Sequence, residues 1–587
     1  MSSQTVESHI PKGTWERQDL EGYRGAHAIT EVLHQAGIKE IFGQSCPTSI
    51  CLAAEKFGIR QIGYRTENAG AAMADGAARV SRKISVVLAQ NGPAAALLVA
   101  GLAEALKASV PILAIVQEVP RTTADKNAFQ ELDHEKLFSA CAKWIRRIDL
   151  ADRAGEFTAR AVQIATSGRP GPVVLLVSPD VLTQPAKKFD FFNHGAENIF
   201  GQFPADRFVP APQSIQAAAD LIFKAKQPLL VVGGGVHHSA AYKQVETLQR
   251  IAGIPVATTN MGKGVIDESN PLSIGVIGNT MGTRAPAKFF RQYIQQADLV
   301  MFIGTRTNEN GTSGWSLFPS AAQYIQIDVD PTELGRNYPA LRLLGDAKSS
   351  LEAINQELQK RELKLLEPRT SKIKETIAGC KAQHQRERAS VINTPQGMLH
   401  PERVVHCLAQ IKEDTIWVAD ASYSSIWLVQ YLPSLLAGSR FLTPRGIAGL
   451  GWGFPMAIGA KLASPDKRVV CLTGDGGFAH CWAELESARR HRVPLTVVVL
   501  NNGVLGFQIN AEEGRFGTHT DVCHFGPIDH VAIAKACGCD GVQVHDERSL
   551  QDALERASFS EVPFVIDVKT DPEAFPPITA FESQRKA

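Results

Sequence analysis

Short apolar runs recur along the chain and alternate with alanine-rich stretches that have helical spacing. The runs are four to six residues long, rich in Val, Ile and Leu, and lack alternating polar positions. This pattern is typical of parallel strands that are covered on both faces. The predicted strands are residues 84–89, 111–116, 173–177, 229–232, 299–303, 324–329, 415–419, 469–473, 495–500 and 564–568.

Helical patterns lie between these runs, for example at residues 92–108 and 479–491. Such an alternation predicts an α/β fold built from doubly wound parallel sheets. Two changes of composition divide the chain. Residues 184–213 carry Pro, Phe and Asn without a period, which indicates a linker, and residues 359–395 are dense in charge, which indicates an exposed helix and a connector. Three domains are therefore expected, at residues 20–183, 210–357 and 396–575.

Composition narrows the classes of function. The chain of 587 residues has 61 Lys and Arg against 60 Asp and Glu, a balance that argues against nucleic-acid binding. No apolar run reaches the roughly 18–20 residues that a membrane span needs. The polar first 22 residues argue against a signal peptide. Ten cysteines without a CxxC pair indicate reduced thiols rather than disulfides or zinc, so we expect a cytoplasmic protein.

The sharpest motif follows the predicted strand 469–473. Gly474, Asp475, Gly476 and Gly477 would turn this strand into a helix that begins near Phe478, where free N–H groups favour a phosphate. Counted from Gly476, 24 residues intervene before Asn501 and Asn502, which end the next strand. A carboxylate and an amide oxygen at the same sheet edge suit Mg²⁺. The competing interpretation is an unrelated glycine turn with a chance asparagine pair.

This GDG…NN spacing resembles the signature of the thiamine-diphosphate enzymes. The likeness extends over nearly the whole chain and is strongest to the acetolactate synthase branch, with supporting stretches at 42–43, 65–69, 127–131, 167–172 and 449–455. It implies an N-terminal pyrimidine-binding domain, a middle domain and a C-terminal diphosphate-binding domain. Mg²⁺ would be held by Asp475, Asn502 and the carbonyl group of Val504. The implied cofactor-binding residues are Asn91, Gly92, Ser422, Ser424, Gly449, Leu450, Gly474, Asp475, Gly476, Gly477, Asn502, Val504 and Leu505.

Glu67 is the second key residue that the resemblance implies. In the family a glutamate at this position comes from the partner subunit and forms a hydrogen bond with N1′ of the aminopyrimidine. The alternative is a carboxylate that only complements a helix dipole. Leu450 matches the bulky residue that holds the cofactor bent, unless it is a plain core leucine, and Gln117 matches an active-site glutamine near the thiazolium.

The middle domain resembles the flavin-binding domain of acetolactate synthases. Its candidate FAD residues are Gly233, Gly234, Arg306, Asp328 and Asp346. A strand-end acid can bind ribose hydroxyl groups, and an arginine can hold a pyrophosphate. Some relatives bind ADP here or leave the domain empty, so the alternative is a structural domain whose acids cap helices.

Several positions depart from acetolactate synthases. Asn310 stands where those enzymes carry an arginine that recognises the carboxylate of the second substrate. Ala511 replaces a tryptophan, and Phe507 replaces a methionine. Ser422 and Ser424 replace a glycine and a histidine, and their hydroxyl groups either donate to the diphosphate or belong to an ordinary turn. The predicted substrate pocket comprises Phe129, Lys143, Asn310, Phe507 and Gln508.

The expected activity is decarboxylation of a 2-oxo acid such as pyruvate, followed by carboligation to an acceptor carbonyl. One alternative is a decarboxylase that does not ligate, or a lyase acting on 2-hydroxy ketones or acyl-CoA. The other is a catalytically silent homologue that binds the cofactor. The resemblance also implies a homodimer or homotetramer with active sites between subunits. The sequence does not identify the donor or the acceptor.

Overall fold

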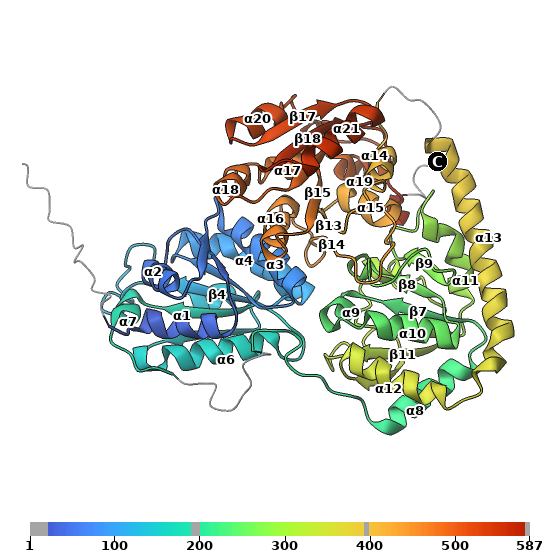
Figure 1. The fold of residues 1–587 in the computed structure, drawn as a ribbon, viewed down its shortest axis with the longest axis horizontal. Helices are drawn as coiled ribbons and strands as arrows, with labels where there is room; N and C mark the ends of the chain where they lie inside the picture. The colour runs from blue at the N-terminus through green and yellow to red at the C-terminus, as the bar shows by residue number, and fades with distance from the viewer. Residues whose placement is uncertain (1–21, 190–199, 393–397, 582–587) are drawn as a thin grey trace, which may run out of the picture.

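The computed structural model describes residues 22–189, 200–392 and 398–581, and its ribbon forms three lobes, each built on a six-stranded sheet (Figure 1). Every strand pair in the three sheets is parallel, as predicted. Apolar clusters lie on both faces of each sheet because the strands are apolar at successive positions. The chain therefore has the α/β architecture that the apolar runs predict.

The first sheet has the order β2-β1-β3-β4-β6-β5. Its strands are β1 (Glu40–Phe42), β2 (Arg60–Ile62), β3 (Ser85–Ala89), β4 (Ile112–Gln117), β5 (Trp144–Ile148) and β6 (Val173–Val177). Its helices are α1 (Gly25–Gln35), α2 (Thr48–Lys56), α3 (Glu67–Ser81), α4 (Pro93–Ala108), α5 (His134–Phe138), α6 (Ala154–Thr166) and α7 (Pro179–Thr183).

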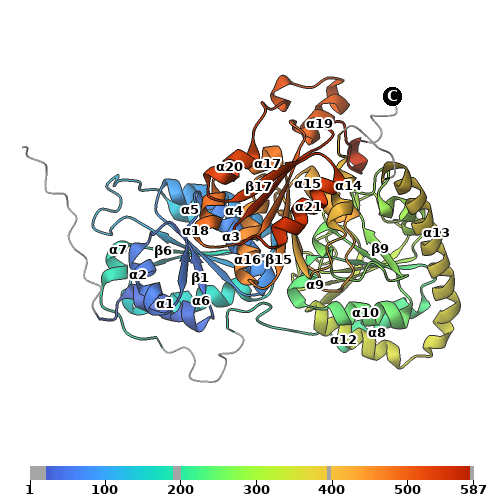
Figure 2. The same cartoon turned by 45° about the horizontal axis from the view of Figure 1, so that its top comes forward.

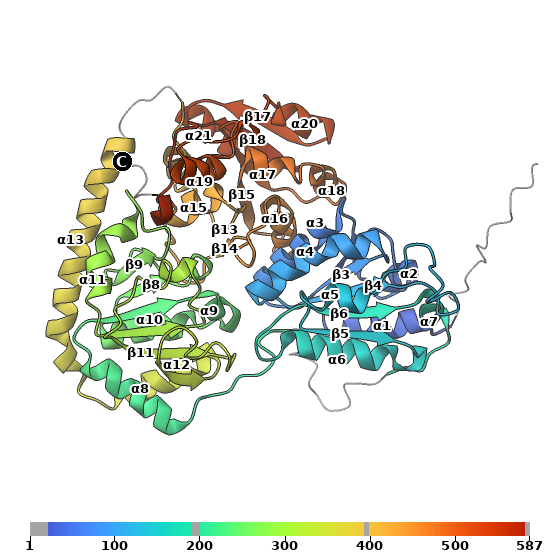
Figure 3. The same cartoon turned by 180° about the vertical axis from the view of Figure 1, so that it is seen from behind.

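The second sheet has the order β12-β11-β10-β7-β8-β9. Its strands are β7 (Pro228–Val232), β8 (Val256–Thr258), β9 (Ser273–Val276), β10 (Leu299–Ile303), β11 (Gln323–Asp328) and β12 (Ala340–Leu344). The helices of this part are α8 (Pro212–Lys224), α9 (Gly234–Ser239), α10 (Tyr242–Ala252), α11 (Arg291–Gln295), α12 (Ala347–Gln359) and α13 (Glu367–Ile392). The long α13 runs along the outer side of this lobe (Figure 3), where Ile373 and Ile377 are buried against it.

The third sheet has the order β14-β13-β15-β16-β18-β17. Its strands are β13 (Thr415–Ala419), β14 (Phe441–Leu442), β15 (Arg468–Gly474), β16 (Thr496–Asn501), β17 (Asp540–Val544) and β18 (Phe564–Lys569). Its helices are α14 (Pro401–Leu408), α15 (Tyr423–Tyr431), α16 (Gly453–Ala463), α17 (Asp475–Ala479), α18 (Glu484–Arg490), α19 (Gly506–Phe516), α20 (His530–Ala536) and α21 (Glu547–Ser558). Gly474 pairs with Leu500, so the two halves of the predicted motif end at the same sheet edge.

All ten predicted apolar runs are strands, with ends displaced by two residues at most. The charge-dense segment contains the predicted exposed helix, α13, although its residues 393–395 lie outside the described residues. Part of the predicted linker at 184–213 also lies outside the described residues. The same is true of nearly all of the polar N-terminal segment, whose composition argues against a signal peptide. Among the described helices, none has the combination of length and apolar character that crossing a bilayer requires.

Helices α3 and α16 join the first and third lobes through reciprocal glycines. A Cβ atom at Gly459 of α16 would stand 1.8 Å from the carbonyl oxygen of Met73, and one at Gly76 of α3 would stand 2.1 Å from the carbonyl oxygen of Met456. Because both obstacles are backbone atoms, only glycine allows this approach. The contact fixes the helix that begins at Glu67 against the helix that follows Leu450.

Candidate active site

A cavity of about 570 Å³ opens at the carboxyl edge of the third sheet. Its walls come from the segments that follow β13, β15 and β16, from the loop before α16, and from Asn279 and Asn310 of the second lobe. Most residues that were predicted to contact the cofactor or substrate line this one cavity: Asn310, Ser422, Ser424, Leu450, Gly474, Asp475, Gly476, Gly477, Asn502, Val504, Leu505, Phe507 and Gln508. The fold therefore gathers residues that are far apart in the sequence.

The glycine segment has a different local structure from the one predicted. Helix α17 begins at Asp475 rather than near Phe478 and has only five residues, and none of the three glycines has a positive φ. Close packing explains Gly477 instead, because a Cβ there would stand 2.1 Å from a carboxylate oxygen of Asp420. At Gly474 a Cβ would meet nothing within 4 Å. The missing side chain at Gly474 thus leaves open space at the cavity wall.

Asp475 is buried at the floor of this cavity. Its Oδ1 accepts the backbone N–H of Gly476 at 2.9 Å, and its Oδ2 accepts that of Gly503 at 2.7 Å. Burial raises the pKa of the Asp475 carboxyl despite these two hydrogen bonds. Each oxygen keeps lone pairs for a further ligand. Asn502 lies beside it after β16, and Val504 follows the turn at Gly503, which has φ +73°. This oxygen-rich set fits a magnesium ion and the diphosphate that such an ion binds.

Asp420, which the sequence interpretation missed, organises the loop before α16. Its buried carboxylate accepts N–H groups from Gly451, Trp452 and Gly453 at 2.9–3.1 Å. Leu450, just before this clamp, keeps 37% of its surface exposed and lines the cavity, so it is not a core leucine. Asp420 directly follows the predicted strand 415–419, and a carboxylate at the carboxyl end of a parallel strand is the sequence signal that indicates such a residue.

Of three predicted residues around this loop, two differ from their predicted roles. Gly449 is not part of the cavity wall. It packs against the Trp452 ring, and a Cβ atom at this position would lie 2.5 Å from the nearest ring atoms. Ser424 Oγ donates to the carbonyl oxygens of Asp420 and Ala421, both at 3.0 Å, so its proton is used within α15. Ser422, with φ +65°, remains the serine whose hydroxyl group can face a ligand.

Phe507 and Gln508 lie at the start of α19, where the C-terminal lobe projects outward (Figure 2). The Phe507 ring makes edge contacts with Tyr423 and Phe581, and Gln508 Nε2 donates to Glu512. Helix α19 buries none of its residues in the described chain. Phe507 and Phe516 of this helix are 42% and 75% exposed, and Phe507 lines the cavity.

The residues predicted on the N-terminal lobe form a separate group at the carboxyl edge of the first sheet. Glu67 opens α3 after β2, Asn91 and Gly92 follow β3, and Gln117 ends β4. None of them lines the cavity of Asp475. Glu67 is buried, and this burial raises the pKa of its carboxyl. The chain thus carries two half-sites, one on each of two sheet edges.

Neighbouring contacts define the rest of this second half-site. Asn91 Nδ2 donates to the carbonyl oxygens of Phe129 and Gln130 at 3.2 and 3.1 Å, while the Phe129 ring is 84% exposed. Lys143 has a different task from the substrate contact we predicted. Its ammonium group donates to the carbonyl oxygens of Ile164, in the last turn of α6, and of Ser167 and Arg169 after it, at 2.5–2.9 Å. Lys143 therefore anchors the end of α6 and the loop that follows.

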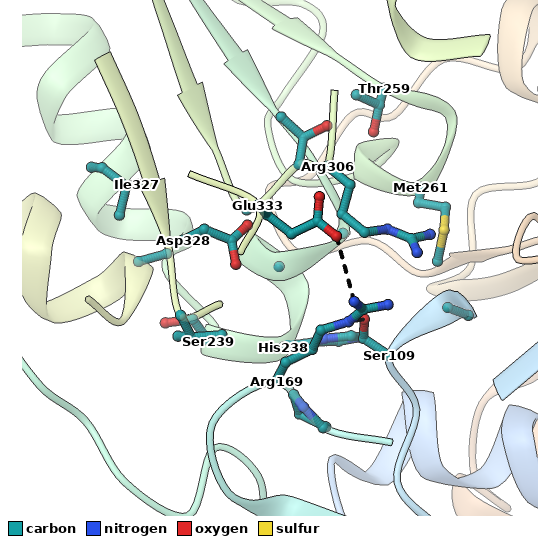
Figure 4. Close-up of a pocket in the computed structure, with 18 of the residues that line it drawn as sticks. Ser109, Arg169, His238, Ser239, Thr259, Met261, Arg306, Ile327, Asp328 and Glu333 are labelled. Atoms are coloured by element: carbon teal, nitrogen blue, oxygen red, sulfur yellow. Dashed lines mark hydrogen bonds and ion pairs between the residues drawn. The ribbon is translucent and has the colours of Figure 1, made fainter. Parts of the chain in front are cut away.

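A second, smaller cavity of about 130 Å³ lies between the first two lobes (Figure 4). Arg306 extends across it toward Met261, and its guanidinium group has no hydrogen bond or ion pair within the described residues. Arg169 reaches in from the first lobe and pairs with Glu333 at 3.5 Å. Burial raises the pKa of the Asp328 carboxyl to about 7. The guanidinium group of Arg306, which has no partner among the described residues, suits a phosphate. The Asp328 carboxyl suits the hydroxyl groups of a ribose.

Two predicted residues of this cavity have structural tasks. Asp346 caps α12 by accepting the N–H of Ser349 and also pairs with Arg207 at 2.7 Å and Ser239 at 2.6 Å. Its oxygens are therefore committed within the lobe, as the helix-cap alternative anticipates. Gly233 does not line the cavity, because it packs against the segment after β10. A Cβ atom at Gly233 would lie 2.4 Å from the carbonyl oxygen of Gly304. Gly234 lines the cavity as predicted.

Comparison with known proteins gives matches along most of the chain. Three family models match: the N-terminal TPP binding domain of thiamine pyrophosphate enzymes over residues 23–137, their central domain over 215–354, and their C-terminal TPP binding domain over 420–568. A probable acetolactate synthase large subunit of Methanococcus aeolicus is 30% identical, over 94% of this chain and 92% of its own length. The acetolactate synthase large subunit of Parasynechococcus marenigrum is 32% identical, over 93% and 87%. An acetolactate synthase of Mycobacterium leprae is 30% identical, over 96% and 90%.

Proposed function

The chain belongs to the thiamine pyrophosphate enzymes, and we propose that it decarboxylates a 2-oxo acid such as pyruvate and joins the remaining acyl unit to an acceptor carbonyl. The observation that carries the proposal is the cavity at the carboxyl edge of the third sheet, where Asp475 and Asn502 meet open space at Gly474. The names of the relatives support the same chemistry.

Asp475, Asn502 and the carbonyl group of Val504 would hold Mg²⁺, and the backbone at Gly474 and Gly476 would lie near the diphosphate. Bound thiamine diphosphate supplies the electron sink that allows CO₂ to leave and a new carbon–carbon bond to form. Leu450 would support the cofactor, since its exposed apolar side chain lines the cavity directly before Gly451, whose N–H donates to Asp420. Glu67 would hold a proton on the aminopyrimidine, because burial raises the pKa of its carboxyl and so favours sharing a proton.

We propose that a second copy of the chain completes each site. Within one chain Glu67 does not line the cavity of Asp475, so both cofactor contacts require the first sheet of a partner. Phe129 of the first lobe and Phe516 of the third lobe are large and exposed, which supports burial between copies. A homodimer satisfies this geometry, and a homotetramer would repeat it.

The second cavity is proposed to take the diphosphate and ribose of a nucleotide, FAD among them. Arg306, Asp328 and Arg169 support this assignment. The enclosed volume of about 130 Å³ is below the roughly 300 Å³ of the smallest common ligand pockets, so a whole dinucleotide would extend beyond it. Flavin fluorescence after denaturing the purified protein tests for FAD.

A cytoplasmic location is also proposed. All ten cysteines are free in the structure, and seven of them are buried, as in proteins of reducing compartments.

The test of the reaction is incubation with Mg²⁺, thiamine diphosphate and pyruvate, followed by proton NMR. Acetolactate or acetoin supports the proposal, and Asp475→Ala should abolish both products. Acetaldehyde alone would indicate the non-ligating decarboxylase, and cofactor binding without turnover of any 2-oxo acid would indicate a silent homologue.

A further inference from the structure

Arg445 lies in the wall that separates the two cavities. It follows β14 in the loop that leads to Leu450, and it lines both the cavity of Asp475 and the cavity of Arg306. Asn310 is the other residue that lines both. A cation from the third lobe and a neutral amide from the second lobe are therefore both part of the wall between the two cavities.

Within the described residues, Arg445 has no carboxylate that forms a salt bridge with its guanidinium group. Its guanidinium donates to Ser425 Oγ, and its Nε is buried with no hydrogen-bond partner. The nearest carboxylate, Glu104, already accepts the N–H groups of Gly446, Ile447 and Ala448. Burial lowers the pKa of Arg445 to about 10, so the group stays charged at neutral pH. A buried cation without a carboxylate partner of its own favours an anionic ligand.

The loop that carries Arg445 is held on both sides. Glu104 fixes the three residues after it, and Arg79 Nη1 donates to the carbonyl oxygen of Thr443, two residues before it. The guanidinium is thus fixed before any ligand arrives, which is the arrangement that makes a cation effective in a site sheltered from water. Asn310 offers a second donor, because its Oδ1 accepts from Asn279 at 3.0 Å and this leaves its Nδ2 for a ligand.

We propose that Arg445, together with the amide of Asn310, binds the carboxylate of the acceptor 2-oxo acid. The inference rests on the proposed carboligation and identifies the acceptor as an acid rather than a neutral aldehyde. A cation on the donor's carboxylate would oppose catalysis, because that group leaves as neutral CO₂ and the attraction is lost in the transition state. The acceptor keeps its carboxylate throughout, so Arg445 can stabilise it at every stage.

The reaction balance makes the prediction measurable. Two pyruvate ions and one proton give one acetolactate ion and one CO₂, with a new bond between the two carbonyl-derived carbons. With acetaldehyde as acceptor, one pyruvate ion and one proton give acetoin and CO₂. Both routes share the donor and the decarboxylation, and they differ in whether the acceptor bears a charge.

The experiment measures the ratio of acetolactate to acetoin by proton NMR, in mixtures of pyruvate and acetaldehyde, with the full-length enzyme loaded with Mg²⁺ and thiamine diphosphate. Arg445→Gln should lower the ratio about 10- to 100-fold, the range for a charged hydrogen bond, while CO₂ release continues. Arg468→Gln is the matched control, since Arg468 lies at the opposite end of β15 and should leave the ratio unchanged.

A second variant covers the case in which Arg445→Gln does not fold. Asn310 is exposed, so Asn310→Asp should fold, and its negative charge should also lower the ratio by repelling the acid acceptor. An unchanged ratio in the folded variants overturns the proposal. If the ratio holds while Arg445→Gln loses bound nucleotide, Arg445 serves the second cavity. If the unmodified enzyme releases no CO₂ from pyruvate, the proposed function itself fails.

Discussion

The glycine contact between α3 and α16 predicts a large effect of a single added methyl group. In Gly459→Ala the new Cβ would stand 1.8 Å from the carbonyl oxygen of Met73, so the helices must separate by about 1.2 Å to restore the shortest tolerated contact. Overpacking of this kind costs about 1–3 kcal/mol, and the obstacle is backbone that cannot change rotamer. The gain of alanine over glycine in a helix, about 1 kcal/mol, offsets only part of it.

Gly379 provides the opposite case. It lies inside α13, and a Cβ there would meet nothing within 4 Å. Gly379→Ala should therefore stabilise the chain by up to about 1 kcal/mol through helix propensity alone. Thermal and urea unfolding of both variants should shift in opposite directions. Equal shifts, or a stabilised Gly459→Ala, would refute the close approach of α3 and α16.

Two further predictions concern ionisable groups. Glu67→Gln should suppress deuterium exchange at C2 of bound thiamine diphosphate while leaving cofactor binding intact, and NMR of the quenched cofactor measures it; unchanged exchange would contradict the role of Glu67. Burial, together with the nearby carboxylates Asp330 and Glu333, raises the pKa of Asp328 to about 7, although Arg169 acts in the opposite direction. Asp328 therefore binds an extra proton in the folded chain, and its contribution to stability falls as pH rises from about 4 to 7. Asp328→Asn should flatten that part of the unfolding profile, and a profile identical to that of the unmodified chain would exclude Asp328 as its source.

The sequence predicts the strands that are buried on both faces, because only these have uninterrupted apolar runs. Eight strands are outside the ten predicted runs. Six of them, β2, β5, β9, β12, β14 and β17, are at sheet edges, where partial exposure or short length weakens the pattern. The other two, β1 and β8, have three residues each. Length and burial, rather than composition, therefore decide which strands can be recognised.

The candidate site shows a similar division. Asp475 and Asn502 are recognisable because each directly follows a strand of the pattern. Asp420 also follows a predicted strand, but its task, accepting three N–H groups of a distant loop, exists only in the folded chain. Arg445 follows a two-residue strand, and no local pattern indicates that its loop reaches both cavities.

The two half-sites allow a direct test of the proposed dimer. Glu67 and Asp475 belong to different sheet edges, and in a two-fold dimer each site would take Glu67 from one copy and Asp475 from the other. Glu67→Gln and Asp475→Asn chains should each be inactive alone. In a dimer of one chain of each kind, one site receives both intact residues and the other receives neither.

Random assembly of equal amounts makes half of the dimers mixed, so co-expression should restore about a quarter of the unmodified activity per site. Co-expression of Glu67→Gln with the double variant that carries both changes is the control, because no pairing of these chains builds an intact site. If both residues acted within one chain, every site in the mixed dimer would carry one defect and no activity would return. Recovery of activity in the mixture, against none in the control, therefore requires that two copies of the chain share each site.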